Sequence, residues 1–139
     1  MSNPNVSCPY CHDLEAGQDI VFENKTFFVR WDKYPVTEGH LLVIPKRHIL
    51  SFAEIREAEG RDMLEAIKAA MNVTKQKVFT DAWNVGVNDG VASGQTIEHT
   101  HIHVIPRKPG DVEDPRGGIR RVLPDKSDYW TASELAANE

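Results

Sequence analysis

The stretch that most constrains this chain is residues 98–107, where three histidines alternate with Thr, Ile and Val before Pro106. A period of two is typical of a β-strand, because successive side chains of a strand point to opposite faces. We therefore expect His99, His101 and His103 to share one face, and the residues between them to pack inward. At a rise of roughly 3.3 Å per residue the outer two lie about 13 Å apart, so no small ion binds all three and their roles should differ.

Two other interpretations of this strand are open at this point. A solvent-facing strand is the plainer one, but three side chains that titrate near neutral pH are an unusual choice for solubility alone. A metal site on His101 and His103 would need a carboxylate and a further histidine nearby, and no Asp or Glu stands at ligand spacing beside them. A phosphate held at His101 could be flanked by His103, whereas His99 would face a different partner.

The composition limits the class of protein. A chain of 139 residues suits one domain, and we expect residues 1–139 to form it, with 110–139 as an irregular extension. A formal charge of −5, from 21 acidic and 16 basic side chains, argues against a nucleic-acid-binding surface. The first seven residues have no basic start and no apolar run, and no apolar stretch reaches membrane-spanning length, so we expect a cytoplasmic protein without a membrane partner.

The two cysteines, Cys8 and Cys11, are three residues apart, which is no framework for a disulfide scaffold. Their Cys-Pro-Tyr-Cys sequence equals a glutaredoxin redox site, but such a site needs a buried strand before it and a helix after it, and we expect neither here. Half of a tetrahedral zinc site is the better interpretation, and two unligated thiols are the plainer alternative. The missing imidazoles would come from His12, His40, His48 or His99.

Hydrophobic patterns and turn residues predict the remaining elements. A hairpin is expected over residues 20–31 and buried strands over 40–44 and 83–88. A short helix over 51–58 and a long one ending near Phe79 should be separated by Gly60. The core-facing stripe of the long helix is expected to consist of Leu64, Ile67, Met71, Thr74 and Val78.

Residues 89–96 form a glycine-bearing loop that leads into the histidine strand. Glycine lets backbone N–H groups approach an anion closely, and Thr96 adds a hydroxyl donor, so this loop can cradle a phosphate. Five basic residues follow the strand, and they either steer an anionic substrate or are simply solvated. They are Arg107, Lys108, Arg116, Arg120 and Arg121.

Together these pieces resemble the histidine-triad (HIT) family of nucleotide hydrolases and transferases. Residues 99–105 fit its signature of three histidines separated by apolar residues, with Thr100 as the one softened position, and residues 39–45 and 94–96 match as well. The resemblance runs from about Cys8 to Pro109. It implies an α+β fold, a five-stranded antiparallel sheet with one long helix, and a homodimer in which two sheets form one continuous surface.

The resemblance also implies a mechanism. His101 would attack the α-phosphorus of a nucleotide and leave a nucleotidyl-histidine that water hydrolyses. The backbone carbonyl of His99 would hold the proton on the other ring nitrogen of His101, so that the attacking nitrogen keeps its lone pair. His103 would donate to the phosphate or the leaving oxygen, and His40 would line the pocket behind the triad.

The resemblance also implies which residues bind the substrate and a metal ion. Asp32 matches the ribose-binding carboxylate, and Arg30 stands where some members have a residue that stacks on the base, which bears on base preference. Charge on the α-phosphate would be stabilised by Asn88, Gly94, Gln95 and Thr96. Bacterial members of similar pattern bind a structural zinc ion through residues that match Cys8, Cys11, His48 and His99. C-terminal aromatic residues that reach a partner subunit's pocket in some relatives match Tyr129 and Trp130.

Three functions are consistent with the resemblance. The first is a hydrolase that cleaves dinucleoside polyphosphates, such as diadenosine tetraphosphate, at the α-phosphate; residues 94–96 and 103–108 are most similar to that branch. The second is a purine nucleoside phosphoramidase, to which Asn88 and the cysteine pair are more similar. A nucleotide-binding module with little turnover is the third, and the intact His101 argues against it.

Overall fold

The computed structural model describes residues 7–129. The chain divides into two compact units, residues 1–108 and 109–139. All strands and α-helices of the described part belong to the first unit, which therefore carries the predicted site. No helix within residues 7–129 is both long enough and apolar enough to cross a membrane.

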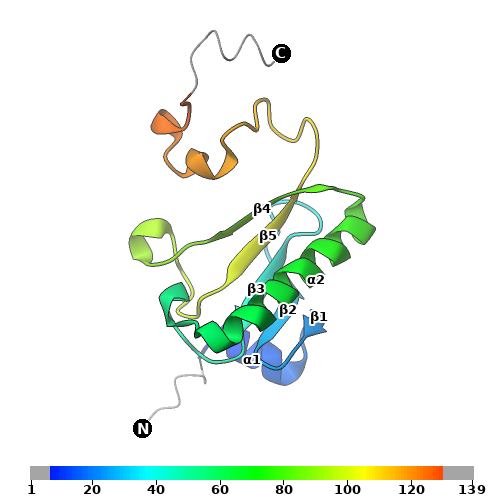
Figure 1. Cartoon of the computed structure of the whole chain (residues 1–139), viewed down its shortest axis with the longest axis vertical. Coiled ribbons are helices and arrows are strands. Elements are labelled where there is room, and N and C mark those ends of the chain that lie inside the picture. Colours follow the sequence, from blue (N-terminus) through cyan, green and yellow to red (C-terminus); the bar gives the residue numbers. More distant parts are fainter. Residues whose placement is uncertain (1–6, 130–139) are drawn as a thin grey trace. The chain divides into compact units, whose positions relative to one another are not determined.

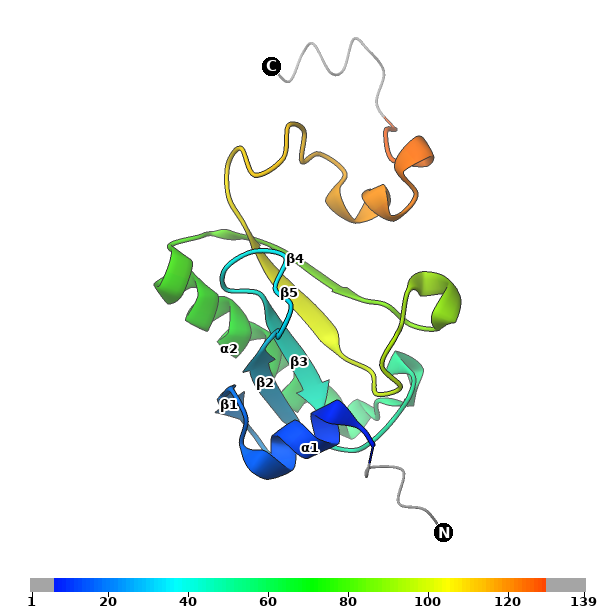
Figure 2. The same ribbon diagram turned by 180° about the vertical axis from the view of Figure 1, so that it is seen from behind.

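The first unit is built on a five-stranded antiparallel sheet with the strand order β1-β2-β3-β5-β4 (Figure 1). Together with one long helix, this sheet confirms the predicted α+β class. β5 lies between β3 and β4, so the histidine strand is an inner strand of the sheet (Figure 2). The strands are β1 (Ile20–Glu23), β2 (Phe27–Trp31), β3 (Leu41–Pro45), β4 (Ala82–Val87) and β5 (Ile102–Arg107).

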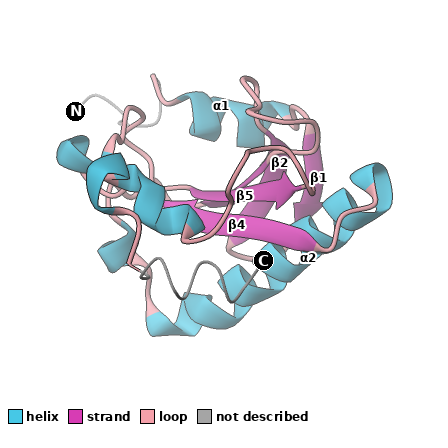
Figure 3. Ribbon diagram, turned by 90° about the horizontal axis from the view of Figure 1, so that it is seen from above, coloured by secondary structure: helices cyan, strands magenta, loops and turns pink. Residues whose placement is uncertain are grey.

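Helix α2 (Gly60–Val78) covers one face of the sheet, and helix α1 (Pro9–Ala16) lies on the other (Figure 3). Ala66 and Ala70 are fully buried at the contact between α2 and the sheet. Their small side chains let the helix backbone approach the strands closely, and burial of each large strand residue contributes about 1.5–3 kcal/mol. The strand residues in this core are Phe27, Val29, Leu41, Val43, Ile102 and Val104.

The predicted stripe of α2 is correct only in part. Thr74 is buried and Ile67 and Met71 pack against the core, but Leu64 is 52% exposed. The line of closest approach runs through Ala66, Ala70 and Thr74, and Leu64 lies about 200° around the helix from Ala66. Apolar spacing alone therefore selected the wrong rotation for the first turn of the helix.

The α1 face of the sheet has its own core, in which Phe28, Leu42 and Ile44 pack against Cys8 and Tyr10. His103 shares this face, because its backbone is paired directly with Leu42 on one side and with Gly86 on the other. The histidine site therefore lies on the sheet face opposite α2.

Helix α1 was not predicted. Cys8 caps its N-terminus, Pro9 occupies the first position, and Gly17 ends it with a φ of 68°. Proline at the start and glycine past the end are ordinary helix boundaries, so the signal was present in the sequence. The expectation that no helix follows the cysteine pair is wrong.

The histidine strand begins later than its pattern predicts. β5 starts at Ile102, so only His103 of the three histidines belongs to the strand. The N–H of Thr100 donates to the carbonyl of Ile49 at 2.8 Å, which draws the preceding backbone away from the sheet ladder. His99 and His101 are consequently placed by a turn, and the expectation that three histidines alternate along one strand is wrong.

Three further boundaries differ. The strand expected over residues 40–44 covers Leu41–Pro45, and β5 continues through Pro106, opposite Trp83, to Arg107. The short helix expected over residues 51–58 consists of two 3₁₀ turns, Phe52–Glu54 and Glu57–Glu59. Gly60, which was expected to separate the two helices, is the first residue of α2.

The second unit has little regular structure within its described part. Its regular elements in residues 109–129 are two 3₁₀ helices, Gly118–Val122 and Pro124–Lys126. The Arg120 guanidinium lies 4.6 Å from the centroid of the Tyr129 ring. Trp130 lies outside the described residues.

Arg30 is buried in β2, with 1% of its side chain exposed, and its guanidinium pairs with the equally buried carboxylate of Asp13 from α1. A second carboxylate, Asp19, lies 3.3 Å away and is 48% exposed. Because removal of the Asp13 carboxylate leaves the buried guanidinium only the half-exposed Asp19 as a charge partner, we expect Asp13→Asn to lower the free energy of unfolding by roughly 3–5 kcal/mol.

Urea denaturation measures this difference. Asp19→Asn is the matched control, because it removes a carboxylate from the same guanidinium at a half-exposed position, and it should cost about 1 kcal/mol or less. Equal effects of the two variants would contradict a stabilising role for the buried pair.

Candidate functional site

His101 is held in the tautomer that a nucleophile needs. Its Nδ1 lies 3.0 Å from the backbone carbonyl of His99, which can only accept, so Nδ1 carries the proton and donates. The lone pair is therefore left on Nε2. With 8% of its surface exposed, the ring is fixed by packing as well as by this hydrogen bond.

His40 reaches the site from the turn before β3. Gly39 has a φ of 93°, and a Cβ there would lie 3.3 Å from Pro106 and from Val78, so this turn requires glycine. The N–H of Val36 donates to His40 Nδ1 at 3.2 Å, which places the His40 proton on Nε2.

The proton on His40 Nε2 in turn determines the tautomer of His103. His40 Nε2 lies 2.9 Å from His103 Nδ1, so His103 accepts there and carries its own proton on Nε2. The rings of His101 and His103 are 5.0 Å apart between centroids. The site thus combines a ring with a free lone pair and a neighbouring ring with a free N–H.

Both supporting rings are neutral at neutral pH. Burial, followed by the nearby His101 and His40, lowers the pKa of His103 to about 4. Burial also lowers the pKa of His40, against an opposing effect of the Asp32 carboxylate. A neutral His40 and a neutral His103 can keep the directed hydrogen bond between them.

Asp32 completes this cluster and uses both carboxylate oxygens. Oδ1 accepts the N–H of Tyr34 at 2.9 Å, and Oδ2 lies 3.3 Å from His40 Nε2. The side chain is 14% exposed, so part of its acceptor capacity faces outward. His40 and His103 together with Asp32 also have their ligand atoms within 4.8 Å of one another. The N–H of Val36 disfavours a metal ion there, because metal at His40 Nε2 would require a proton on Nδ1.

The glycine loop is held together by Gln95. Its amide oxygen accepts the N–H of Gly90 at 2.8 Å, and its amide nitrogen donates to the carbonyls of Leu50 and Ile97. The Gln95 side chain is therefore committed to the loop itself. Gln95 and Thr96 line a cavity of about 330 Å³ together with Leu50, Ser51, Asp89, Gly90, Val91 and Glu98.

Asp89 also anchors the loop, because its carboxylate accepts the hydroxyl of Ser51 and the N–H of Phe52. Thr96 is exposed and Asn88 is half-buried. Within residues 7–129 no hydrogen bond joins Asn88, Gly94 or Thr96 to the rings of His101 and His103. Their grouping around a phosphate therefore stays a prediction.

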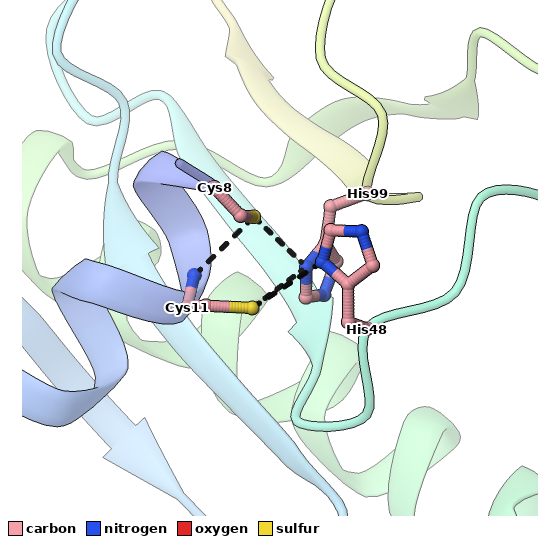
Figure 4. A group of neighbouring side chains, drawn as sticks. All are labelled: Cys8, Cys11, His48 and His99. Atoms are coloured by element: carbon pink, nitrogen blue, oxygen red, sulfur yellow. Dashed lines mark hydrogen bonds between the residues drawn. The ribbon is translucent and has the colours of Figure 1, made fainter. Parts of the chain in front are cut away.

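The four residues expected to bind zinc lie together (Figure 4). Cys8 and Cys11 come from the start of α1, His48 from the segment after β3, and His99 from the turn before β5. The Cys8 sulfur lies 3.3 Å from His99 Nδ1, and the Cys11 sulfur lies 3.3 Å from His48 Nδ1 and 3.6 Å from His99 Nδ1. A tetrahedral zinc ion would place sulfur and nitrogen ligands roughly 3.5 Å apart, so the group has the right size.

The protonation of these ligands also fits a cation. His99 Nε2 donates to the carbonyl of Pro45 at 2.7 Å, which leaves Nδ1 with its lone pair toward the cysteines. Burial and the neighbouring Cys8 raise the pKa of Cys11 to about 12, so its thiol keeps a proton at neutral pH unless a metal replaces it. The other two candidate histidines are elsewhere, since His12 is 75% exposed and His40 belongs to the cluster with Asp32.

Two features of the site were not anticipated. Tyr10, between the cysteines, packs edge-on against the rings of both His99 and His101, with centroid distances of 5.7 and 5.0 Å. Arg30 was expected at the base pocket, but its guanidinium is buried against Asp13. The unrecognised helix α1 explains both, because it carries Tyr10 and Asp13 onto this face of the sheet.

The low pKa of His103 makes stability depend on pH. The pKa is about 4 in the folded chain against 6.5 for a free histidine. The unfolded chain therefore takes up the extra proton as the pH falls, and this contribution, roughly 3 kcal/mol, is present above pH 6.5 and is lost toward pH 4.

We expect His103→Gln to flatten the pH dependence of the free energy of unfolding across this window, as measured by urea denaturation. His12→Gln, at a 75% exposed position, should keep the wild-type slope. A His103→Gln variant with an unchanged slope would show that the ring titrates normally.

Comparison with known proteins relates this chain to one family. A HIT domain family model matches residues 13–110. The bis(5'-nucleosyl)-tetraphosphatase [asymmetrical] of Schizosaccharomyces pombe is 30% identical over 105 residues, which cover 76% of this chain and 58% of that protein. An adenylylsulfatase of Arabidopsis thaliana is 39% identical over 116 residues, covering 82% of this chain and 59% of the relative. The chain thus spans less than two thirds of either relative's length.

A solved structure extends the similarity over nearly the whole chain. The Zn-bound histidine triad family protein of Mycobacterium smegmatis superposes with a TM-score of 0.69 at 28% identity, covering 97% of this chain and 99% of that one. Its fold, together with the family match and the arrangement of His99, His101 and His103, shows that this chain belongs to the histidine-triad (HIT) family.

Proposed function

We propose that this chain hydrolyses nucleotides at the α-phosphate, through a nucleotidyl-histidine intermediate on His101. The observation that carries the proposal is the hydrogen bond from His101 Nδ1 to the carbonyl of His99. This bond leaves the lone pair of the buried ring on Nε2, where it can attack phosphorus. Family membership supports hydrolysis of nucleotides in general.

The reaction follows from the two tautomers. His101 Nε2 bonds to the α-phosphorus as the bond from that phosphorus to the leaving group breaks. His103, which has first taken up a proton beside the bound phosphate, gives its Nε2 proton to the leaving group and returns to the neutral form. An anionic phosphate beside His103 counters the effect of burial and favours its protonated form. In the second step water gives a proton back to His103 and attacks the phosphorus, which breaks the P–N bond and frees the nucleoside monophosphate.

The substrate contacts are proposed on different grounds. Asp32 is partly exposed beside the His40–His103 pair, so its outward lone pairs suit ribose hydroxyls. For the phosphate we propose Asn88, Thr96 and the backbone of Gly94 and Gln95, since the Gln95 side chain is engaged within the loop. Arg30 receives no role in base recognition, because it is buried against Asp13.

Dinucleoside polyphosphates are the preferred substrate class. The S. pombe relative carries a tetraphosphatase activity in its name, which supports this choice. Purine nucleoside phosphoramidates are the second candidate, since the cysteine pair of that branch is present here and is assembled with two histidines. A nucleotide-binding module with little turnover is the remaining alternative.

We expect His101→Ala to lower AMP release from the preferred substrate about a thousandfold or more, because no other ring in the site has its lone pair free. Release is measured from diadenosine tetraphosphate and from adenosine phosphoramidate, and the faster substrate identifies the branch. Rapid quenching and mass spectrometry of the wild type should detect a nucleotidyl group on His101.

The control is His12→Ala, at the 75% exposed histidine, which should keep the wild-type rate. Retained activity in His101→Ala would refute the proposed nucleophile. A wild-type protein that binds nucleotides but turns over neither compound would favour the binding module.

A structural zinc ion on Cys8, Cys11, His48 and His99 is part of the proposal. When bound, the ion would be held by two thiolates and two neutral imidazoles, and it would connect α1 to the turn before β5. The distances within the group and the Zn-bound relative from M. smegmatis support it. The His99 side chain would then serve the ion while its backbone carbonyl serves His101.

We expect about one zinc ion per chain after purification, measured by plasma mass spectrometry, and a large fall in both zinc content and melting temperature for Cys11→Ser. His12→Gln again serves as control, since its ring is exposed and outside the group. Near-zero zinc in a wild-type protein of normal stability would refute the zinc site.

Two further expectations stay proposals. β4 is an edge strand on which Val85 is 38% exposed, so it can pair with a second chain and extend the sheet into a homodimer; the sedimentation coefficient tests this. The cytoplasmic location and the single-domain organisation of residues 1–139 stay predictions.

A further inference from the structure

We propose that Cys8 and Cys11 are an oxidative modification site, at which a hydroperoxide closes a disulfide, expels the metal and so withdraws support from the nucleophile. The inference rests on the proposed zinc site. It makes the metal centre a switch for the reaction of His101 instead of a passive brace.

The two sulfurs are arranged for disulfide formation. Cys8 caps α1, and the N–H of Cys11 points to the Cys8 sulfur at 3.5 Å, within the first turn of the helix. A Cys-x-x-Cys pair at the start of a helix is the arrangement that redox proteins use. A redox site was not expected here because no helix was predicted after the cysteines. Helix α1 supplies that helix.

A small oxidant has a route to the pair. Cys8 is 6% exposed, but it lines a cavity of about 310 Å³. The other residues that line it are Ser7, Pro9, His48, Thr96, Ile97 and Glu98. A hydroperoxide is small enough to enter a cavity of this size, whereas a protein thiol is not.

His99 transmits the change to the nucleophile. Its Nδ1 faces both sulfurs at 3.3 and 3.6 Å, its Nε2 is tied to the carbonyl of Pro45, and its own carbonyl accepts the His101 proton. A disulfide turns the sulfurs toward each other and releases the metal, so the Pro45 carbonyl remains as the hydrogen-bond partner of the His99 ring. Tyr10 moves with the same helical turn, and its ring contacts His99 and His101 directly.

The step balances with one hydroperoxide per site. One thiolate attacks the outer oxygen of ROOH to give a sulfenic acid and, after protonation, ROH. The second thiolate attacks that sulfur, forms the S–S bond and releases the oxygen as water. Two thiolates are oxidised to one disulfide, one hydroperoxide is reduced to ROH and water, two protons are consumed, and Zn²⁺ departs.

The experiment treats the full-length, zinc-loaded chain with hydrogen peroxide. Zinc release is followed with a colorimetric chelator, disulfide formation by the loss of two hydrogen masses, and AMP release in parallel. We expect one zinc per disulfide, a fall in rate of at least about tenfold, and recovery with dithiothreitol plus zinc. Retention of zinc and both thiols, or a disulfide formed with an unchanged rate, would overturn the proposal.

One further readout separates this inference from the proposed function. The imidazole ¹H–¹⁵N spectrum should lose the His101 Nδ1 proton signal on oxidation, and it does so whether or not a substrate is known. If the reduced protein has no hydrolytic activity, the proposed function fails, while zinc release and this signal still decide the switch. A chain that binds no zinc, or an unchanged signal after zinc loss, overturns the inference itself.

Cys11→His is the matched variant, because it keeps four ligands and cannot form the disulfide. We expect it to retain its zinc in peroxide and to keep the rate that it had before treatment. Loss of zinc from this variant at the wild-type rate would show that peroxide acts elsewhere. If the variant does not fold, the zinc, mass and spectral measurements on the wild type decide alone.

Discussion

The backbone turn at His99 is the constraint on which the site depends. His99 is fully buried, and a buried imidazole without partners would be costly, so both ring nitrogens have partners, as does the backbone carbonyl. Its ring is anchored to Pro45 and faces the cysteines, and its carbonyl accepts the His101 proton. These contacts act together with the hydrogen bond from the Thr100 N–H to the Ile49 carbonyl, which keeps residues 99–101 out of the strand, and the orientation of His101 is a consequence.

The two faces of the sheet are stabilised by different means. Against α2 the contact is almost entirely apolar, and burial of apolar surface stabilises it. Against α1 the sheet buries Arg30, Asp13, His40 and His101, each with a partner. Within residues 7–129 the Thr100 hydroxyl is the buried side-chain group without one. The reactive histidines thus lie on the face where buried polar groups have hydrogen-bond or charge partners, and α2 packs against the opposite face.

Much of the fold could be predicted from periodicity. The alternating runs over β1, β2, β3 and β4 and the turn residues between them define strands locally, and their boundaries differ from the structure by one or two residues. What periodicity could not supply was long-range bonding. The start of β5 depends on the hydrogen bond of Thr100 to Ile49, and the rotation of α2 depends on how closely Ala66 approaches the sheet.

The site was predictable to a similar depth. Residue type and spacing indicated His101 and the four metal-binding candidates, because their chemistry is local or shared with a family. The partners that determine protonation, such as the N–H of Val36 and the carbonyl of Pro45, are backbone groups, and backbone groups leave no mark in a sequence. Arg30 is a residue whose role could not be inferred from its own position. It was expected near the base pocket, but α1 brings Asp13 against it and the two form a buried ion pair.

Asp32 carries a consequence for how such a site can diverge. One of its oxygens holds the turn at Tyr34, and the other lies beside the ring that orients His103. If the same carboxylate also holds the sugar, then a substitution that adapts the pocket to a different sugar would disturb the proton donor at the same time. Sugar preference and turnover would then be inherited together, and new specificity in this scaffold would have to arise at the base or at the leaving group.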